Sequence, residues 1–514
     1  MKSKTPKFIW LLPPILSLGT ILIYAINIAH WDDHAIKYSV KNLLESNSTS
    51  EQLGLFFSQH NEHRIPITRL LALLSVKILG YLDFRFLMGI GFGFLVGIFL
   101  IIKRLYISFE LVLMSSILLF IPAFYENQFW GMAAVQNFGV AFFALLAAYF
   151  LTKEKLSLAI IFAFVAMFTS ANGIVILISI SLFLLLKKNW QWLIVWLFAV
   201  ILILSLFCYN YAFVPNENNA LFSIFDVAKG FVFSAGNIID FQPIFPKIRW
   251  YVLGLIGSIQ IGLAAYFLIK MVVKKNLSEV EKFNFIACLF ILGTIAGTAI
   301  SRSNFGLETL LNSKYKLYPF LLLIINFCQL NTTFGNFQKP MISLAIFVFI
   351  FSYLFDFQEV INLRNSRIAE YYNGFKFEKS PLKDVFFMKE PKEIIDLQAS
   401  LPTKTPFQTD FKIDKNQTEY QLSFKPRVVT NNGFLKLKSD SNSYIFPQIN
   451  KIHDWKSLVK IVLLKRNNPI VIIPKLGIET GKYSLEILEN GLSYQTKDSI
   501  NIEGQTYINP QKNW

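Results

Sequence analysis

Residues able to move protons gather in one stretch, 30–64, which follows the first apolar segment of the chain. It holds His30, Asp32, Asp33, His34, His60, Glu62, His63 and Arg64. Carboxylates and imidazoles commonly act as general acids and bases. His60, Glu62 and His63 are also candidate ligands of a divalent metal together with Asp32 or Asp33, although no HExxH spacing occurs. A hydrogen-bonded loop scaffold is the third interpretation.

The residues after the acidic pair Asp32 and Asp33 predict a helix on a membrane surface. Apolar residues recur at i, i+4, i+7 and i+8, namely Ile36, Val40, Leu43 and Leu44. A one-sided apolar stripe of this kind is typical of a helix lying on a bilayer. The two aspartates would stand at its membrane-proximal start, where Asp33 has a second interpretation as the helix cap.

The composition is that of a polytopic membrane protein. The 514 residues are 54% hydrophobic, include 52 Phe and have a mean hydropathy of +0.46. About eleven candidate spans follow one another, at 8–28, 86–102, 107–123, 132–151, 156–169, 174–186, 190–211, 250–272, 283–300, 316–330 and 340–357. The short pair 156–169 and 174–186 predicts a hairpin of two partial-depth helices, or else one broken span. The predicted fold is therefore mainly α, a transmembrane helix bundle.

Charge segregation predicts the topology. With the N-terminus inside, every short basic turn faces the cytoplasm and most acids of the membrane portion face outward. The segment 65–82 is apolar but carries Arg69 and Lys77, so we expect it to lie along the outer interface with these side chains snorkelling. The formal net charge is +16, but the basic residues form no cluster with interleaved aromatic residues. The sequence therefore does not predict nucleic-acid binding. The three cysteines lie in apolar segments and predict neither disulfides nor a metal site.

Residues 358–514 predict a soluble domain on the outer face. Helices are expected at Glu359–Tyr372 and Glu390–Ala399, and strands from about residue 418, including 457–464. Asn431-Asn432-Gly433 and Asn490-Gly491 supply candidate hairpin turns. A small β-rich domain, with a sandwich as one possibility, would close the chain after the membrane domain 1–357 and its outer loop 29–85.

Three further outward-facing segments carry polar and aromatic residues. The first is the turn 125–130, with Glu126 and Trp130. The second is the loop 212–250, which includes Asp240 and Arg249. The third runs from Ser301-Arg302 to Ser313-Lys314-Tyr315.

These features together resemble the GT-C class of integral-membrane glycosyltransferases. The resemblance covers residues 1 to about 357: a short basic N-terminus, one span, a long outer loop opening with an acidic pair, an interface helix and many further spans. The stretch from Ser301-Arg302 to Ser313-Lys314-Tyr315 is similar to a Gly-Arg … Ser-Arg-Tyr pattern of uncharacterised bacterial members. Ser301 and Lys314 depart from it, and Lys314 cannot form the bidentate contacts of an Arg.

The resemblance implies transfer of a sugar from a polyprenyl-phosphate carrier to a hydroxyl of a glycan, lipid or protein, on the outer face of the cytoplasmic membrane. Asp33, with Asp32 second, is the implied base, and Arg302, then Lys314 and Arg64, would bind the donor phosphate. Other candidates for substrate binding are His60, Glu62, His63, Glu126, Trp130 and Tyr315. No cofactor is expected, and a divalent metal stays open.

The candidate residues also have non-catalytic interpretations. Arg302 and the aromatic residues would serve equally as interfacial anchors, and Glu126 as part of a solvated loop. Two other function classes are open. A lipid-linked glycan flippase would need ionisable groups or broken helices at mid-membrane, and the apolar segments hold almost no acids. The hypothesis of a non-catalytic envelope assembly protein does not explain why so many charged residues gather in the loop 30–64.

Overall fold

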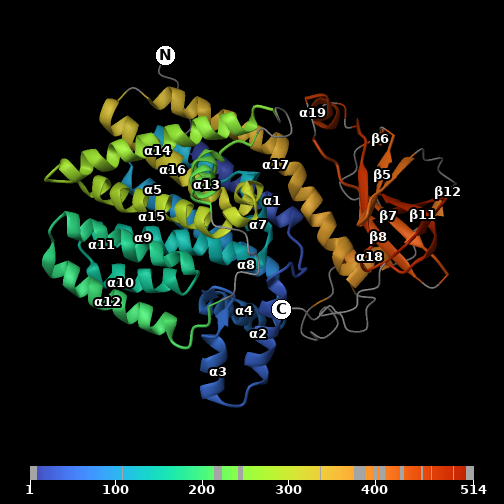
Figure 1. The fold of residues 1–514 in the computed structure, drawn as a ribbon, viewed down its shortest axis with the longest axis horizontal. Coiled ribbons are helices and arrows are strands. Elements are labelled where there is room, and N and C mark those ends of the chain that lie inside the picture. The colour runs from blue at the N-terminus through green and yellow to red at the C-terminus, as the bar shows by residue number, and fades with distance from the viewer. Residues whose placement is uncertain are drawn as a thin grey trace.

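The structure is a computed structural model. It describes residues 8–106, 108–213, 223–240, 247–335, 337–374, 389 and 392–504, with gaps at 399–402, 405–410, 426, 429–432, 441, 453–454, 463, 465 and 490. Figure 1 shows a helical bundle, a small group of helices at its edge and a β-rich domain beyond one long helix.

Each of the eleven predicted segments contains a helix. These helices are α1 (Leu12–Tyr24), α5 (Phe84–Leu105), α6 (Phe109–Leu119), α9 (Gly139–Thr152), α10 (Leu156–Met167), α11 (Ile174–Leu186), α12 (Trp190–Cys208), α14 (Arg249–Val273), α15 (Glu279–Arg302), α16 (Leu317–Phe334) and α17 (Gln338–Gly374). The buried faces of all of these helices except α1 share one large apolar cluster, and Ile21 of α1 packs in a smaller cluster with Phe129 and Val360. Many outward faces are apolar as well, for example Phe198 and Leu255, which suits a lipid-facing surface.

Fewer than eleven of these helices are long enough to cross a bilayer alone. In the described part of the chain, seven are long and apolar enough, or eight if Phe109–Leu119 and Pro122–Phe129, bent by 42°, form one span. The apolar helices Ile9–Tyr24, Leu156–Met167 and Ala171–Leu186 are shorter. The structure thus supports a membrane-embedded helical protein, while eleven spans remain a prediction. The short α10 and α11 agree with the predicted hairpin, whose Gly173 packs against the backbone of Met167 where a Cβ would clash at 2.4 Å.

The loop 29–85, which was predicted to face outward and is called the outer loop, folds into three short helices and a two-stranded hairpin: α2 (Asp33–Glu45), α3 (Thr49–Phe56), β1 (Gln59–His60), β2 (His63–Arg64) and α4 (Pro66–Leu79). The helix predicted after Asp32 and Asp33 is confirmed as α2, while its position on a membrane surface stays a prediction. It buries Ile36, Val40 and Leu43 but also Lys37, while Leu44 is exposed. With 14 residues, α4 is about 21 Å long and too short to cross the roughly 30 Å hydrocarbon core. The expectation that Arg69 snorkels is wrong, because its side chain is buried in protein.

The predicted boundary at residue 357 lies inside a helix. α17 continues for 37 residues, from the apolar bundle into the C-terminal part, without a break at residues 357 and 358. Its second half packs on the β-rich domain, where Ile368 and Tyr371 share an apolar cluster with Phe434 and Ile445. The helix α18 (Lys392–Gln398) falls within the segment predicted as the second helix. One continuous helix therefore joins the two domains, as Figure 1 shows.

The C-terminal domain is built on two larger sheets. One has the order β10 (Ile470–Pro474), β5 (Glu419–Phe424), β4 (Phe411–Lys415), and the other the order β3 (Thr403–Lys404), β12 (Leu492–Ile502), β11 (Gly481–Glu489), β7 (Gly433–Lys438), β8 (Ser443–Pro447). Alternate residues such as Leu422 and Val471 from one sheet and Leu437 and Leu485 from the other form a common core. A two-stranded pair, β6 (Arg427–Val428) with β9 (Arg466–Asn467), completes the strands of the described part. The predicted β-rich fold is confirmed.

Two local predictions in this domain are wrong or only partly testable. Residues 457–464, predicted as a strand, lie largely in helix α19 (Trp455–Val462), because Trp455, Leu458, Val459 and Val462 also fit the spacing i, i+3, i+4, i+7. Glu489 pairs with Leu492 across a turn whose Gly491 has a φ of 73°, as expected of a tight hairpin. Asn490, Asn431 and Asn432 lie outside the described residues, and β6 and β7 pair with other strands rather than with each other.

The turns between the bundle helices fall into two groups, one at each end of the bundle, as the distribution of basic and acidic residues predicted. Three contacts join basic turns at one end of the bundle: Lys153 with Glu279, Lys187 with the carbonyl of Lys274, and Lys103 over the ring of Trp10. At the other end the loop 29–85 contacts the turns near residues 130, 171, 208 and 302. Which membrane is crossed, and in which direction, remain predictions.

Candidate functional site

Asp32 and His60 line a polar cavity in the outer loop. The cavity has a volume of about 390 Å³ and is lined by Asp32, Ala35, Tyr38, Ser39, Asn42, Leu55, Ser58, Gln59, His60, Asn61 and Arg69. The Asp32 side chain is 40% exposed, and its Oδ1 lies 3.9 Å from His60 Nε2, which is too long for a hydrogen bond. The Asp32 carboxylate is therefore open to a small molecule that enters this cavity.

Asp33, the carboxylate preferred from the sequence, has the opposite surroundings. It is fully buried, and its Oδ1 and Oδ2 accept hydrogen bonds from the backbone N–H groups of Met132 (2.8 Å) and His30 (3.2 Å). Burial raises the pKa of Asp33 to about 7, although the nearby Arg367 opposes this shift. Asp33 thus fastens the start of α2 to the turn after Trp130. It caps no N–H group of its own helix, so its interpretation as a helix cap is wrong, while its role as a base stays a prediction.

Glu62, His63 and Arg302 form a second group beside the hairpin of the outer loop. The Nη2 of Arg302 donates to Oε1 of Glu62 at 2.6 Å, and His63 Nε2 lies 3.8 Å from the same oxygen. Nδ1 of His63 accepts a hydrogen bond from the backbone N–H of Ala171. Arg302 thus contacts the first loop, but it does not line the cavity of Asp32.

Burial and neighbouring groups together shift the pKa values of this group's ionisable residues. It lowers the pKa of His63, on which the charges of Glu62, His60, Arg302 and Asp32 act more weakly, and it also lowers the pKa of His60. Burial alone would raise the pKa of Glu62, but His63 and Arg302 outweigh it and hold that pKa below its ordinary value. Near neutral pH the site therefore combines neutral imidazoles with an ionised Glu62.

Arg64, a predicted phosphate ligand, is committed to backbone carbonyls. Its Nε donates to Phe207 O at 2.6 Å, its Nη1 to Phe57 O at 2.6 Å, and its Nη2 to Tyr209 O. The buried Arg69 likewise donates to Phe56 O and Ser58 O. Because carbonyls at the ends of α3 and α12 have no further helical partner, a buried guanidinium satisfies several at once. These contacts point to a structural role for Arg64.

The turns 125–130 and 313–315, far apart in sequence, hold each other. Oε2 of Glu126 accepts from Lys314 N–H at 2.9 Å, Ser313 Oγ donates to Ala123 O at 2.8 Å, and Asn127 Nδ2 donates to Lys314 O at 2.9 Å. Glu126 therefore supports the backbone of the second turn, which the sequence could not indicate.

An aromatic group with one cation lies where these turns meet the first loop. The rings of Trp31 and Trp130 are 6.2 Å apart, and Lys314 Nζ lies 5.7 Å from the Trp130 ring and 5.3 Å from the Tyr315 ring. The backbone N–H of Lys314 binds Glu126, but its ammonium makes no ion pair with a carboxylate among the described residues. Trp130 is buried and its Nε1 has no hydrogen-bond partner there either. The group could thus hold an anion beside a flat apolar surface.

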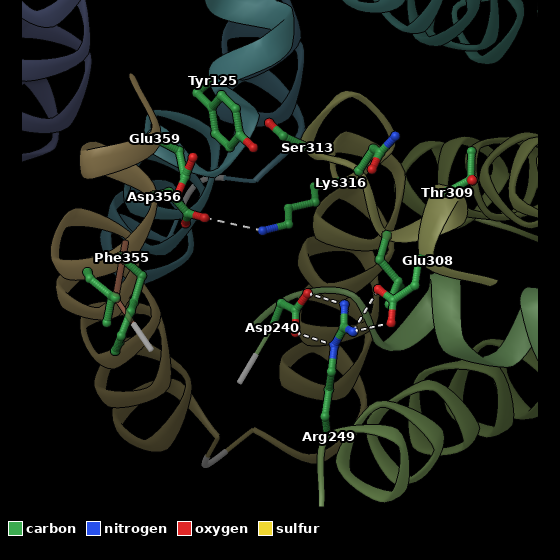
Figure 2. Close-up of a pocket in the computed structure, with 13 residues that line it drawn as sticks. Tyr125, Asp240, Arg249, Glu308, Thr309, Ser313, Lys316, Phe355, Asp356 and Glu359 are labelled. Atoms are coloured by element: carbon green, nitrogen blue, oxygen red, sulfur yellow. Dashed lines mark hydrogen bonds and ion pairs between the residues drawn. The ribbon is translucent and has the colours of Figure 1, made fainter. Parts of the chain in front are cut away.

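A second polar cavity, of about 400 Å³, lies between α7 (Tyr125–Phe129), α14 and α17. Figure 2 shows Arg249 between Asp240 and Glu308, and Lys316 facing Asp356. Arg249 binds both carboxylates at 2.6–2.7 Å, and Lys316 Nζ lies 3.3 Å from Asp356. The sequence marked Asp240 and Arg249 as outward-facing but named none of these residues as a site. The signal in the sequence that could have indicated this cavity is the presence of acidic residues at the predicted outer ends of several spans.

No group of three His, Cys, Asp or Glu side chains that could hold a metal occurs in the described ranges. Comparison with known proteins identifies no relative: no family model, no curated protein and no solved structure matches the chain.

Proposed function

We propose that the protein is a membrane glycosyltransferase. It would transfer a sugar from a polyprenyl-phosphate donor to an acceptor hydroxyl on the outer face of the cytoplasmic membrane. The observation that carries this proposal is the open carboxylate of Asp32 in a polar cavity at the end of an apolar helix bundle. The resemblance to the GT-C class and the cations of the neighbouring turns support it. A lipid-linked donor needs such a site, because its head reacts in water while its tail stays in hydrocarbon.

In the proposed reaction, Asp32 accepts the proton of the acceptor hydroxyl as its oxygen attacks the anomeric carbon of the sugar. The new bond joins that carbon to the acceptor oxygen, and the bond from the carbon to the phosphate oxygen breaks. The electron pair leaves with the polyprenyl phosphate. His60, neutral and next to Asp32, would orient the carboxylate or the acceptor.

Two cations would stabilise the departing phosphate. Lys314 carries a charge that no described carboxylate neutralises, and its aromatic neighbours offer a surface for the first carbons of the lipid or for the sugar ring. Arg302 keeps guanidinium N–H groups beyond the one that binds Glu62. The sequence favoured Arg302 as the phosphate ligand, but this proposal prefers Lys314. The Lys314 ammonium has no anionic partner that it would have to release before it binds phosphate.

The test is a transfer assay with the purified chain in nanodiscs that also contain extracted bacterial envelope lipids and glycans as acceptors. The donors are undecaprenyl phosphates carrying radiolabelled glucose, galactose, mannose or N-acetylglucosamine. We expect label to move to acceptor with at least one donor. Lys314→Gln should raise the KM for that donor about tenfold, the factor for one lost charge-assisted hydrogen bond.

The control variant is Lys412→Gln, an exposed change in β4 that should leave transfer unchanged. Failure of all four donors, together with no binding of undecaprenyl phosphate, would overturn the proposal. Binding of the lipid-linked sugar without transfer would instead favour a transporter.

A further inference from the structure

A third cavity, of about 620 Å³, lies at the end of the bundle opposite the outer loop. The ends of α5, α14 and α16, with the starts of α6 and α15, enclose it. Its lining residues are Leu105, Tyr106, Ser108, Leu111, Phe267, Lys270, Met271, Lys274, Ser278, Val280, Glu281, Asn284, Gln329, Asn331, Thr332 and Thr333. Because α14 begins at Arg249, in the second cavity, and ends at Val273, the two sites are separated by its length of about 38 Å.

The charged groups of this cavity leave a positive excess. Lys274 Nζ is bound to both oxygens of Glu281, at 2.7 and 2.9 Å, so that pair is neutral. Lys270 has no ion pair with any described residue. Lys187 adds another cation nearby, since its Nζ donates to the carbonyls of Met271 and Lys274. An anion entering the cavity would therefore meet one free ammonium with a second positive group beside it.

Gln329, one of the residues that line this cavity, has an amide nitrogen without a partner. The residue is only 4% exposed, and its Nε2 makes no hydrogen bond with any described residue. Leaving such a buried donor unpaired costs roughly 1–3 kcal/mol, so a ligand that accepts a hydrogen bond would gain from filling the site. The hydroxyls of Ser108, Thr332 and Thr333 supply further donors at its rim.

The remaining wall is apolar and lies at the level where the spans end. Phe267 and Met271 on α14 and Leu105 and Leu111 on the facing helices give a surface that suits hydrocarbon. Lysines in the last turn of a span reach toward phosphate groups at the bilayer surface. We propose that this cavity binds the phosphate head of an anionic membrane lipid, with Lys270 as the cation and Gln329 as the buried donor. The proposal does not depend on the proposed glycosyltransferase activity.

The proposal is tested by native mass spectrometry of the full chain released from nanodiscs. One set contains phosphatidylglycerol and the other phosphatidylcholine, which carries phosphate without net negative charge. We expect tight retention of phosphatidylglycerol and much weaker retention of phosphatidylcholine. Lys270→Gln should reduce phosphatidylglycerol retention about tenfold, as should Gln329→Leu, each removing one hydrogen bond to phosphate.

Lys155→Gln is the matched control, because Lys155 is an exposed lysine on a basic turn outside the cavity. Lys270 is exposed on its helix, so its variant should fold even if Gln329→Leu does not. Equal retention of the two lipids, or retention unaffected by Lys270→Gln, would overturn the proposal. Displacement of the lipid by millimolar inorganic phosphate would show a site for free anions rather than for a lipid.

Discussion

Asp32→Asn and Asp33→Asn form a matched pair, because the same change is made at neighbouring positions with opposite surroundings. The Asp32 side chain is 40% exposed, and among the described residues its ion-pair partner is His60, at 3.9 Å. Its replacement should change the free energy of unfolding by no more than about 1 kcal/mol, the usual limit for an exposed ion pair. An amide cannot accept the acceptor's proton, so turnover should fall by about 10²–10⁴.

Asp33→Asn should instead act on stability. Its two carboxylate oxygens each accept one backbone N–H, from Met132 and from His30. An amide retains one acceptor oxygen and turns an NH₂ group toward the other N–H, which loses its partner in a buried site. This should lower the free energy of unfolding by roughly 1–3 kcal/mol. Transfer per folded molecule should stay near the wild-type value.

Both variants are measured in two assays on the same detergent-purified samples. Tryptophan fluorescence during heating gives Tm, and transfer of labelled sugar from the polyprenyl-phosphate donor gives turnover. Full turnover by Asp32→Asn would remove Asp32 from the mechanism. Loss of turnover by Asp33→Asn at unchanged Tm would return the base to Asp33, as the sequence alone suggested.

Three further predictions follow from the same contacts. Arg64→Gln should lower the free energy of unfolding by about 3 kcal/mol or more, because hydrogen bonds from a buried cation to three carbonyls are lost. It should leave the KM for the donor unchanged. Measurements of Tm and of transfer against donor concentration check the two results. Burial raises the pKa of Asp33 from 3.8 to about 7, so between these pH values the folded protein keeps a proton that the unfolded chain releases. Tm should therefore fall as pH rises from about 4 to 7 and level off above, and Asp33→Asn should flatten this slope. In a Cys208→Ser background, Ser48→Cys and Lys412→Cys should react in intact cells with a membrane-impermeant maleimide while Lys188→Cys should not; labelling of only one of the first two would refute the topology.

The sequence by itself determined the features that depend on short-range pattern. Apolar runs predicted a helix at each of the eleven bundle segments, and the i, i+4 stripe after Asp33 predicted α2. Alternating residues predicted the β-rich end, although 457–464 fits helical and strand periods alike and was assigned wrongly. These features are set by neighbours a few residues apart, so no knowledge of the fold is needed to read them.

Only the tertiary structure decided which charged residues are accessible. Asp32 and Asp33 are adjacent and chemically identical. The backbone N–H of Met132, 99 residues away, donates a hydrogen bond to one oxygen of Asp33, whose side chain is fully buried. Arg302 and Arg64 were both predicted to bind phosphate. Arg64 donates to carbonyls near residue 208, and Arg302 binds Glu62, which is 240 residues away in the sequence. Burial and partner choice depend on elements brought together by packing, and no local pattern encodes them.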